Sequence, residues 1–145
     1  MIIRDILAVK QQKDIYGISP EALVSEAVSQ MVKHDVGSLV VQGKKGMVGL
    51  LTQRQLIQCM AEHRCDLADA RVKDLMLTEP VIGNPDDTVD YVRGVMTDQH
   101  LSHLPVMQDS ELLGIISFHD VARACLSEAD FENRLLKRYI KHWPE

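Results

Sequence analysis

The chain is poor in cysteine and in aromatic residues. Among its 145 residues, Cys59, Cys65 and Cys125 are the only cysteines, and they form no CxxC pair. A structural zinc site needs such paired spacing, and a secreted disulfide scaffold needs a denser, even set of cysteines. The sequence therefore predicts three reduced cysteines that act as small apolar residues, and no zinc site.

Long apolar runs are also absent, because none approaches the roughly 18 residues that a membrane-spanning helix needs. The first residues, MIIRDILAVKQQKD, carry Asp5 and lack a small-residue cleavage site, so no signal peptide is predicted. The net charge of −5 disfavours a non-specific nucleic-acid binder, which needs a clustered basic face. We expect a cytoplasmic protein that has no membrane or nucleic-acid partner.

What is present is typical of a globular chain, with 46% hydrophobic and 26% charged residues. The chain is organised around Leu101–Asp120. Two apolar runs, Leu104–Met107 and Leu112–Ile116, predict strands joined by a polar turn. They close on a Ser-x-x-Asp corner, Ser117 to Asp120, which predicts the start of a helix.

The same pattern occurs earlier in the chain. A shift of 65 residues aligns residues 20–56 with residues 85–121 without a gap, and further pairs match in apolar class, among them Ala27/Val92, Met47/Leu112 and Leu50/Ile115. The identical pairs are Pro20/Pro85, Val24/Val89, Met31/Met96, Leu39/Leu104, Val41/Val106 and Gly49/Gly114. Such a register indicates an internal duplication of a unit of about 60 residues, which buries little surface and would be marginally stable alone.

Each unit is predicted to run strand, helix, strand, strand, helix. In the first unit, Ile15–Ile18 is the first strand and Ser19-Pro20-Glu21 is a helix start. That helix has an apolar face of Val24, Ala27, Val28, Met31 and Val32. A second helix follows Thr52, with Leu56, Ile57 and Met60 on its apolar side.

In the second unit, Val81–Ile82 is the first strand and Asn84–Asp87 is a turn and helix start. The last helix is expected to run from near Phe118 to Ile140. The distal part of this helix carries a stripe that suits a homodimer or another partner, formed by Phe131, Leu135, Leu136, Tyr139 and Ile140.

Four segments together resemble the cystathionine-β-synthase (CBS) domain: GLLTQRQ at 49–55, TEPVIGNPDDTV at 78–89, HLPVM at 103–107 and GIISFHD at 114–120. The resemblance covers nearly the whole chain and is to a small, stand-alone bacterial pair of CBS domains, a Bateman module. It implies an α+β fold of two β-α-β-β-α repeats, packed sheet to sheet with pseudo-twofold symmetry. The expected repeats are residues 1–66, with an N-terminal helix, and 67–128, followed by a helical extension at 129–145.

The resemblance implies a regulatory protein rather than an enzyme, with no required cofactor. CBS pairs bind AMP, ADP, ATP, NAD(H) or S-adenosylmethionine in clefts between the repeats. We expect a homodimer that acts on a regulated protein, whose identity the sequence does not give. The alternative is an interaction or dimerisation module of the same fold that has lost nucleotide binding.

Matching the family pattern residue by residue makes Asp120 the ribose ligand and Ser117 the phosphate-side hydroxyl. A carboxylate at a helix start suits this chemistry, although both residues also suit a plain helix cap. The other residues expected in this cleft are Ser102, His103, Ile115, His119, Asp14, Ile15, Tyr16, Val36 and Gly37.

A second, weaker cleft is expected because Gln55 replaces the ribose Asp in the first repeat. Its residues would be Thr52, Gln55, Ser38, Thr78, Pro80, Val81 and Leu101. Ser102 stands where relatives tend to carry Arg, which removes a bidentate phosphate partner. We expect His103 and His119 to compensate in part when protonated, below about pH 6.5. These histidines and His100 lack the spacing of a metal site.

Overall fold

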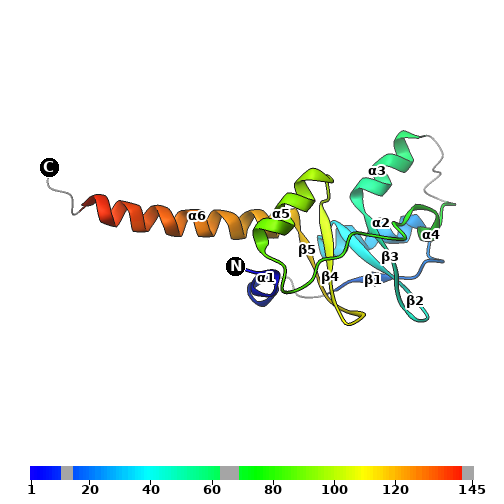
Figure 1. Cartoon of the computed structure of the whole chain (residues 1–145). Coiled ribbons are helices and arrows are strands. Elements are labelled where there is room, and N and C mark those ends of the chain that lie inside the picture. Colours follow the sequence, from blue (N-terminus) through cyan, green and yellow to red (C-terminus); the bar gives the residue numbers. More distant parts are fainter. Residues whose placement is uncertain (11–14, 63–68, 142–145) are drawn as a thin grey trace.

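The computed structural model describes residues 1–10, 15–62 and 69–141, with side chains as far as residue 138. Asp14 and Cys65 therefore lie outside the described residues. The elements follow the chain as α1 (Ile3–Val9), β1 (Gly17–Ile18), α2 (Val24–His34), β2 (Ser38–Gly43), β3 (Gly46–Thr52), α3 (Gln53–Ala61), α4 (Val72–Leu75), α5 (Val89–Asp98), β4 (His103–Gln108), β5 (Glu111–Ser117) and α6 (Phe118–Lys141) (Figure 1).

Two small sheets preserve the duplication. Strand β1 pairs in parallel with β2, and β2 pairs antiparallel with β3, whereas β4 and β5 form a separate antiparallel pair. The register of each hairpin shifts at the corresponding place, after Val41 in one and after Val106 in the other. The two register shifts lie 65 residues apart. This match supports the 65-residue repeat more strongly than the six identities do.

The predicted strand at Val81–Ile82 is wrong, because the structure has a single parallel bridge there, from Gly83 to Val106. The bridge corresponds to the pairing of Ile18 with Val41 in the first sheet, displaced by 65 residues. At Gly83 the second repeat thus keeps one pairing of the kind that β1 makes in the first repeat. The second sheet accordingly has two strands where the first has three.

Both predicted helix starts are too early. The Ser19 Oγ accepts a hydrogen bond from the Glu21 N–H, at 3.2 Å, within a turn, and α2 begins only at Val24. Likewise Asn84 caps a turn, with its Oδ1 accepting from the Asp86 N–H at 2.9 Å. Helix α5 is capped instead by Thr88, whose Oγ1 accepts from the Tyr91 N–H at 3.1 Å. The prolines belong to turns that precede the helices.

The helices on the outer faces of the sheets cover two hydrophobic clusters. In the first, Ala27 and Met31 of α2 pack with β2, β3 and Val72 of α4. In the second, α5 and α6 pack with β4, β5 and with Ile3 and Ile6 of α1. The N-terminal helix therefore packs on the second repeat, and α4, at the start of the second repeat, packs on the first. The boundaries expected at 66/67 and 128/129 remain a prediction.

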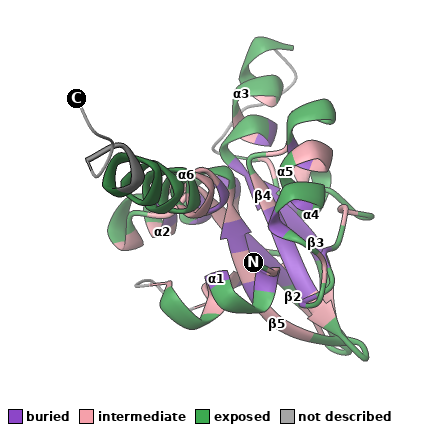
Figure 2. Cartoon of the chain, turned by 60° about the vertical axis from the view of Figure 1, so that its left-hand side comes forward, coloured by how far each residue is buried: buried purple, intermediate pink, exposed green. Residues whose placement is uncertain are grey.

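The sheets bury residues on their inner faces as well. Val40 and Leu50 are 1% exposed although they belong to neither helix-side cluster, because side chains alternate along a strand. Figure 2 shows the buried colour concentrated on the strands, with α3 and α6 largely exposed. Three helix residues expected to be buried are in fact exposed: Val32 (77%), Ile57 (66%) and Met60 (56%).

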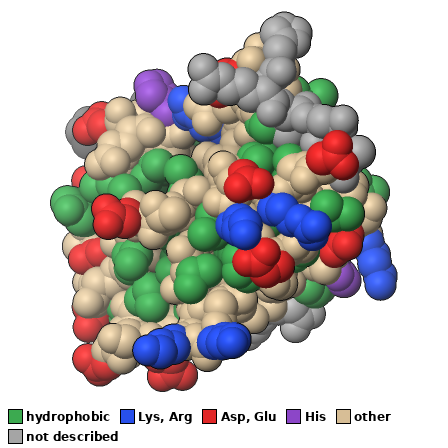
Figure 3. Space-filling view, turned by 90° about the vertical axis from the view of Figure 1, so that its right-hand side faces the viewer, with side chains coloured by type: hydrophobic (Ala, Val, Ile, Leu, Met, Phe, Trp, Pro, Cys, Tyr) green, Lys and Arg blue, Asp and Glu red, His purple; other side chains and the backbone are tan. Residues whose placement is uncertain are grey.

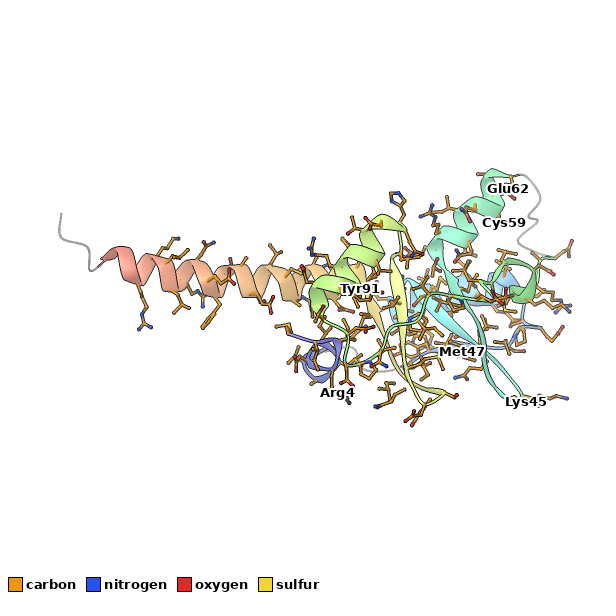
Figure 4. All side chains as sticks on the ribbon, in the orientation of Figure 1. Arg4, Lys45, Met47, Cys59, Glu62 and Tyr91 are labelled. Atoms are coloured by element: carbon orange, nitrogen blue, oxygen red, sulfur yellow. The ribbon has the colours of Figure 1, made fainter. Side chains whose placement is uncertain are left out.

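The structure also revises the expectation for cysteine. Cys59 is disulfide-bonded, so the prediction of a reduced thiol is wrong at this position, whereas Cys125 is a free thiol. Figure 4 places Cys59 on α3, near the end of the helix that Glu62 follows. No helix among the described residues is long and apolar enough to cross a membrane.

Candidate functional site

A cleft of about 490 Å³ lies between the two repeats. One wall comes from Ile15 and Tyr16 before β1, the turn from Asp35 to Ser38, and Val40 of β2. The opposite wall comes from β4, β5 and the start of α6, and the end of α1 completes it. Side chains of both sheets face the same space because the repeats pack sheet to sheet.

Most residues expected around Asp120 are brought together here. Those lining the cleft are Asp120, Ser117, His103, His119, Ile115, Ile15, Tyr16, Val36 and Gly37. Ser102 does not line it; this exposed residue places its Oγ 2.9 Å from Nδ1 of His103. Ser38, assigned to the second cleft, lines this one instead.

Asp120 and Ser117 cap α6 reciprocally. The Ser117 N–H donates to Oδ2 of Asp120 at 2.8 Å, and the Asp120 N–H donates to the Ser117 Oγ at 3.1 Å. The capping function is therefore present. The Ser117 N–H and the Lys10 Nζ both contact the same oxygen of Asp120, Oδ2. The carboxylate can thus cap the helix and still accept a hydrogen bond from a ligand.

Lys10 is a charged residue of the cleft that sequence reasoning missed. Its Nζ lies 2.9 Å from Oδ2 of Asp120 and donates to the Ile115 carbonyl oxygen at 2.6 Å. The two side chains of this ion pair are only 17% and 10% exposed. No local sequence signal identifies Lys10, since it reaches the cleft only because α1 packs on the second repeat.

The pKa of Asp120 is held below its usual value, although burial alone would raise it. The hydrogen bond from the Ser117 N–H and the ammonium group of Lys10 both favour the ionised form and outweigh desolvation. Asp120 is consequently a carboxylate at neutral pH. This is the protonation state that accepts hydrogen bonds from hydroxyl groups most strongly.

His103 behaves differently from the expectation. Burial lowers its pKa to about 4, and the positive charge of Lys10 adds to the effect, while Asp120 opposes it. The imidazole is therefore neutral at pH 6. The prediction that His103 gains charge below about pH 6.5 is wrong, because its environment excludes solvent and already contains a cation.

A second basic group lies on the first turns of α6. Arg123, which was not among the expected residues, lines the cleft, and its Nη2 is 2.8 Å from Nε2 of His119. Across the cleft, the ring of Tyr16 stacks on His34 with ring centroids 3.8 Å apart. The cleft therefore combines apolar and aromatic walls with two carboxylates, Asp35 and Asp120, and two cationic side chains, Lys10 and Arg123.

Neither the cleft of about 490 Å³ nor a second cavity brings together the residues of the expected second cleft, which stays a prediction. A different hollow of about 570 Å³ contains Gln55 but none of the other six. Thr52 and Gln55 are 4% and 8% exposed, and the Gln55 Oε1 accepts from the Thr52 N–H at 2.9 Å. Sequence periodicity correctly places the strand-to-helix corner at Thr52 and Gln55, but it does not show that these two residues are buried. Within the described residues, no group of three metal-ligating side chains could hold a metal ion.

The fold and the site define a class, namely a duplicated α+β module that encloses a polar and apolar cleft between its repeats. The model of the CBS domain matches this chain twice, at residues 3–62 and 72–127. The chain belongs to the CBS domain family, and it is a tandem CBS pair.

Known proteins of this family resemble the chain over most of its length. The mitochondrial CBS domain-containing protein CBSX3 of Arabidopsis thaliana is 30% identical over 123 residues, which are 81% of this chain and 60% of that protein. The crystal structure of a CBS-domain protein from Agrobacterium tumefaciens is 28% identical with a TM-score of 0.79, covering 86% of this chain and 98% of the other. The CBS domain pair of protein MJ0100, solved with 5'-methylthioadenosine and S-adenosyl-L-methionine, is 22% identical with a TM-score of 0.75, covering 88% and 98%.

Proposed function

We propose that the chain is a regulatory, non-catalytic sensor that binds one adenosyl ligand in the cleft between its repeats. The observation that carries the proposal is the position of Asp120. Its ionised carboxylate lines the cleft, and the contacts with the Ser117 N–H and with Lys10 both use Oδ2. A ribose diol supplies two adjacent hydroxyl donors that suit such an acceptor.

The remaining walls suit the other parts of an adenosyl ligand. Val36, Leu113 and Ile115 provide apolar surface that can sandwich a purine ring, and Tyr16 lies on the same side as Val36. The start of α6 beside Ser117 suits an anionic group because backbone N–H groups and the helix dipole favour negative charge. Lys10 and Arg123 add positive charge along the same wall.

The MJ0100 pair supports an adenosyl ligand, because methylthioadenosine and S-adenosylmethionine share that group. For this chain we include AMP, ADP, ATP and NAD(H), which contain the same adenine and ribose. We expect no required cofactor and no turnover of the ligand. A ligand-dependent change in the relative position of the repeats would be read by a regulated protein partner.

One ligand per chain is expected. The first-repeat corner that corresponds to Ser117 and Asp120 has a neutral amide at Gln55, and this amide is buried and already bonded to Thr52. A neutral acceptor contributes roughly 1 kcal/mol, against about 1.5–3 for a charged one. The two halves of the module are therefore functionally asymmetric.

The test is calorimetric titration of the full chain with AMP, ADP, ATP, NADH, S-adenosylmethionine and methylthioadenosine. We expect binding of at least one ligand at one site per chain, and a loss of tenfold or more in Asp120→Asn. Asp86→Asn is the matched control, because Asp86 is exposed and outside the cleft. Thermal unfolding of each variant separates loss of binding from loss of fold.

Absence of heat and of thermal stabilisation with all six ligands would overturn the sensor proposal. The alternative, an interaction module of the same fold without nucleotide binding, would then hold. Binding that Asp120→Asn leaves unchanged would place the ligand elsewhere. Steady conversion of a bound nucleotide by the purified chain would contradict the non-enzymatic assignment.

A further inference from the structure

Helix α6 continues well beyond the body of the module. Its first turns pack on the second repeat, with Val121 fully buried. From Leu126 to Arg138, by contrast, every side chain is exposed. Figures 1 and 4 show this part of α6 projecting away from the sheets with no other element beside it.

The projecting part of α6 is too apolar for a helix that stands alone in water. Leu126, Phe131, Leu135 and Leu136 are 65%, 63%, 48% and 60% exposed. Leu126, Ala129, Asn133 and Leu136 follow a 3-4-3 spacing, which forms one seam along a helix as in a two-stranded coiled coil. Isolated helices of this length are marginal in water, so packing against a partner would stabilise the segment.

The charges of the same segment are separated by sign along the helix. An acidic half contains Glu128, Asp130 and Glu132, and a basic half contains Arg134, Lys137 and Arg138. Within the described chain only Glu128 of these six forms an ion pair, with the Met1 amino group at 3.6 Å. At the opposite end of the molecule, acidic and basic side chains are interspersed (Figure 3).

We propose that a second copy of this chain covers the segment, with the two α6 helices antiparallel. A twofold axis that reverses the helix direction brings the acidic half of each copy against the basic half of the other, twice. A parallel pair would place like charges side by side, which is destabilising. The segment is thus self-complementary in charge only in the antiparallel arrangement.

The expected dimer is reversible. The segment from Leu126 to Arg138 is about 20 Å long at roughly 1.5 Å per residue, so the interface falls at the lower end of stable interfaces. The inference goes beyond the ligand-binding proposal and does not depend on it. Binding at the Asp120 cleft and self-association through α6 can each be present without the other.

Sedimentation equilibrium of the full chain tests the proposal. We expect a dimer whose dissociation constant rises at least tenfold in Leu136→Glu. Ile57→Glu on α3 is the matched control, because Ile57 is 66% exposed and distant in sequence from α6. We expect this control to dimerise normally. Both positions are exposed, so neither substitution disturbs a buried contact.

Charge exchange tests the direction of the helices. Asp130→Lys with Glu132→Lys leaves Glu128 as the one acid among these six and makes the segment net basic, and Lys137→Glu with Arg138→Glu leaves Arg134 as the one base and makes it net acidic. Each double variant should dissociate at least tenfold more readily, and a 1:1 mixture of the two should recover the dimer. The quadruple variant, which exchanges both halves and keeps the net charge, should dimerise with itself but not with the unmodified chain.

Three results would overturn the proposal. A chain that stays monomeric at the highest accessible concentration would show that another partner covers α6. A dimer that is lost in Ile57→Glu and retained in Leu136→Glu would place the interface elsewhere. Preferential pairing of the quadruple variant with the unmodified chain would show that the helices are parallel.

Discussion

Lys10 at the end of α1 and Asp120 in the first turn of α6 form a mostly buried ion pair inside the cleft, with 2.9 Å between Nζ and Oδ2. The pair joins the segment that precedes the first repeat to the corner expected to hold a ligand. Lys10 helps to hold the pKa of Asp120 below its usual value, and it adds to the burial that lowers the pKa of the neighbouring His103, while Asp120 opposes that effect.

Removing either member of this pair should destabilise the fold. Lys10→Met and Asp120→Asn are each expected to lower the free energy of unfolding by about 1–3 kcal/mol, because each leaves a poorly solvated partner behind. The double variant should lose less than the sum of the two. Urea denaturation of all four chains gives the coupling energy.

The Arg4–Asp86 pair is the control for that cycle, since its side chains are 50% and 67% exposed. Its coupling should be below about 1 kcal/mol. The folded state lowers the pKa of Asp120, so the coupling at Lys10–Asp120 should be present at neutral pH and lost as the pH falls through that pKa. Equal coupling energies for the two ion pairs would contradict the claim that burial strengthens the Lys10–Asp120 pair.

The lowered pKa of His103 predicts a loss of stability in mild acid. Its pKa falls from 6.5 to about 4 on folding, so the unfolded chain binds a proton between these values while the folded chain does not. The free energy of unfolding should therefore decrease by up to about 3 kcal/mol from pH 6.5 to 4. The His103→Gln variant should lack this decrease. His119→Gln is the control because His119 is exposed. Parallel pH curves for His103→Gln and the unmodified chain would refute this prediction.

Gly37 is predicted to tolerate no larger side chain. A Cβ at this position would lie 2.9 Å from Cε1 of His103 and 3.2 Å from its Nε2, and both residues line the cleft. Gly37→Ala should cost about 1–3 kcal/mol of stability and weaken ligand binding.

Gly94→Ala provides the matched comparison. Gly94 lies inside α5 and an added Cβ would meet nothing within 4 Å. The substitution should raise stability by about 0.5–1 kcal/mol because alanine restricts the unfolded chain. If Gly37→Ala behaves like Gly94→Ala in thermal unfolding and in titration, the close contact with His103 has no consequence.

Gln55→Asp should not create a second ligand site. The change places a carboxylate at the corner of the first repeat. Because position 55 is only 8% exposed, the new aspartate would put a charge in a buried position. We expect about 1–3 kcal/mol of destabilisation and still one ligand per chain. Gln58→Asp, on an exposed position of the same helix, should be nearly neutral. Two ligands bound per Gln55→Asp chain would disprove the prediction.

The sequence alone determined the duplication, the hairpins and the corner at Ser117 and Asp120. These features depend on local periodicity and on short hydrogen-bonded motifs, which are written in adjacent residues. The family resemblance then located most of the cleft around Asp120. The helix starts were misplaced because proline and serine serve turns as readily as helices, and only tertiary packing selects between them.

Tertiary structure alone decided the position of α1 on the second repeat, and with it the presence of Lys10 in the cleft. The pairing joins residues 110 positions apart, and an exposed-looking lysine in a polar stretch gives no sign of it. The same holds for the neutral His103 and the buried Gln55. Charge state and accessibility depend on what surrounds a side chain in three dimensions. Patterns of neighbouring residues along the chain do not show those surroundings.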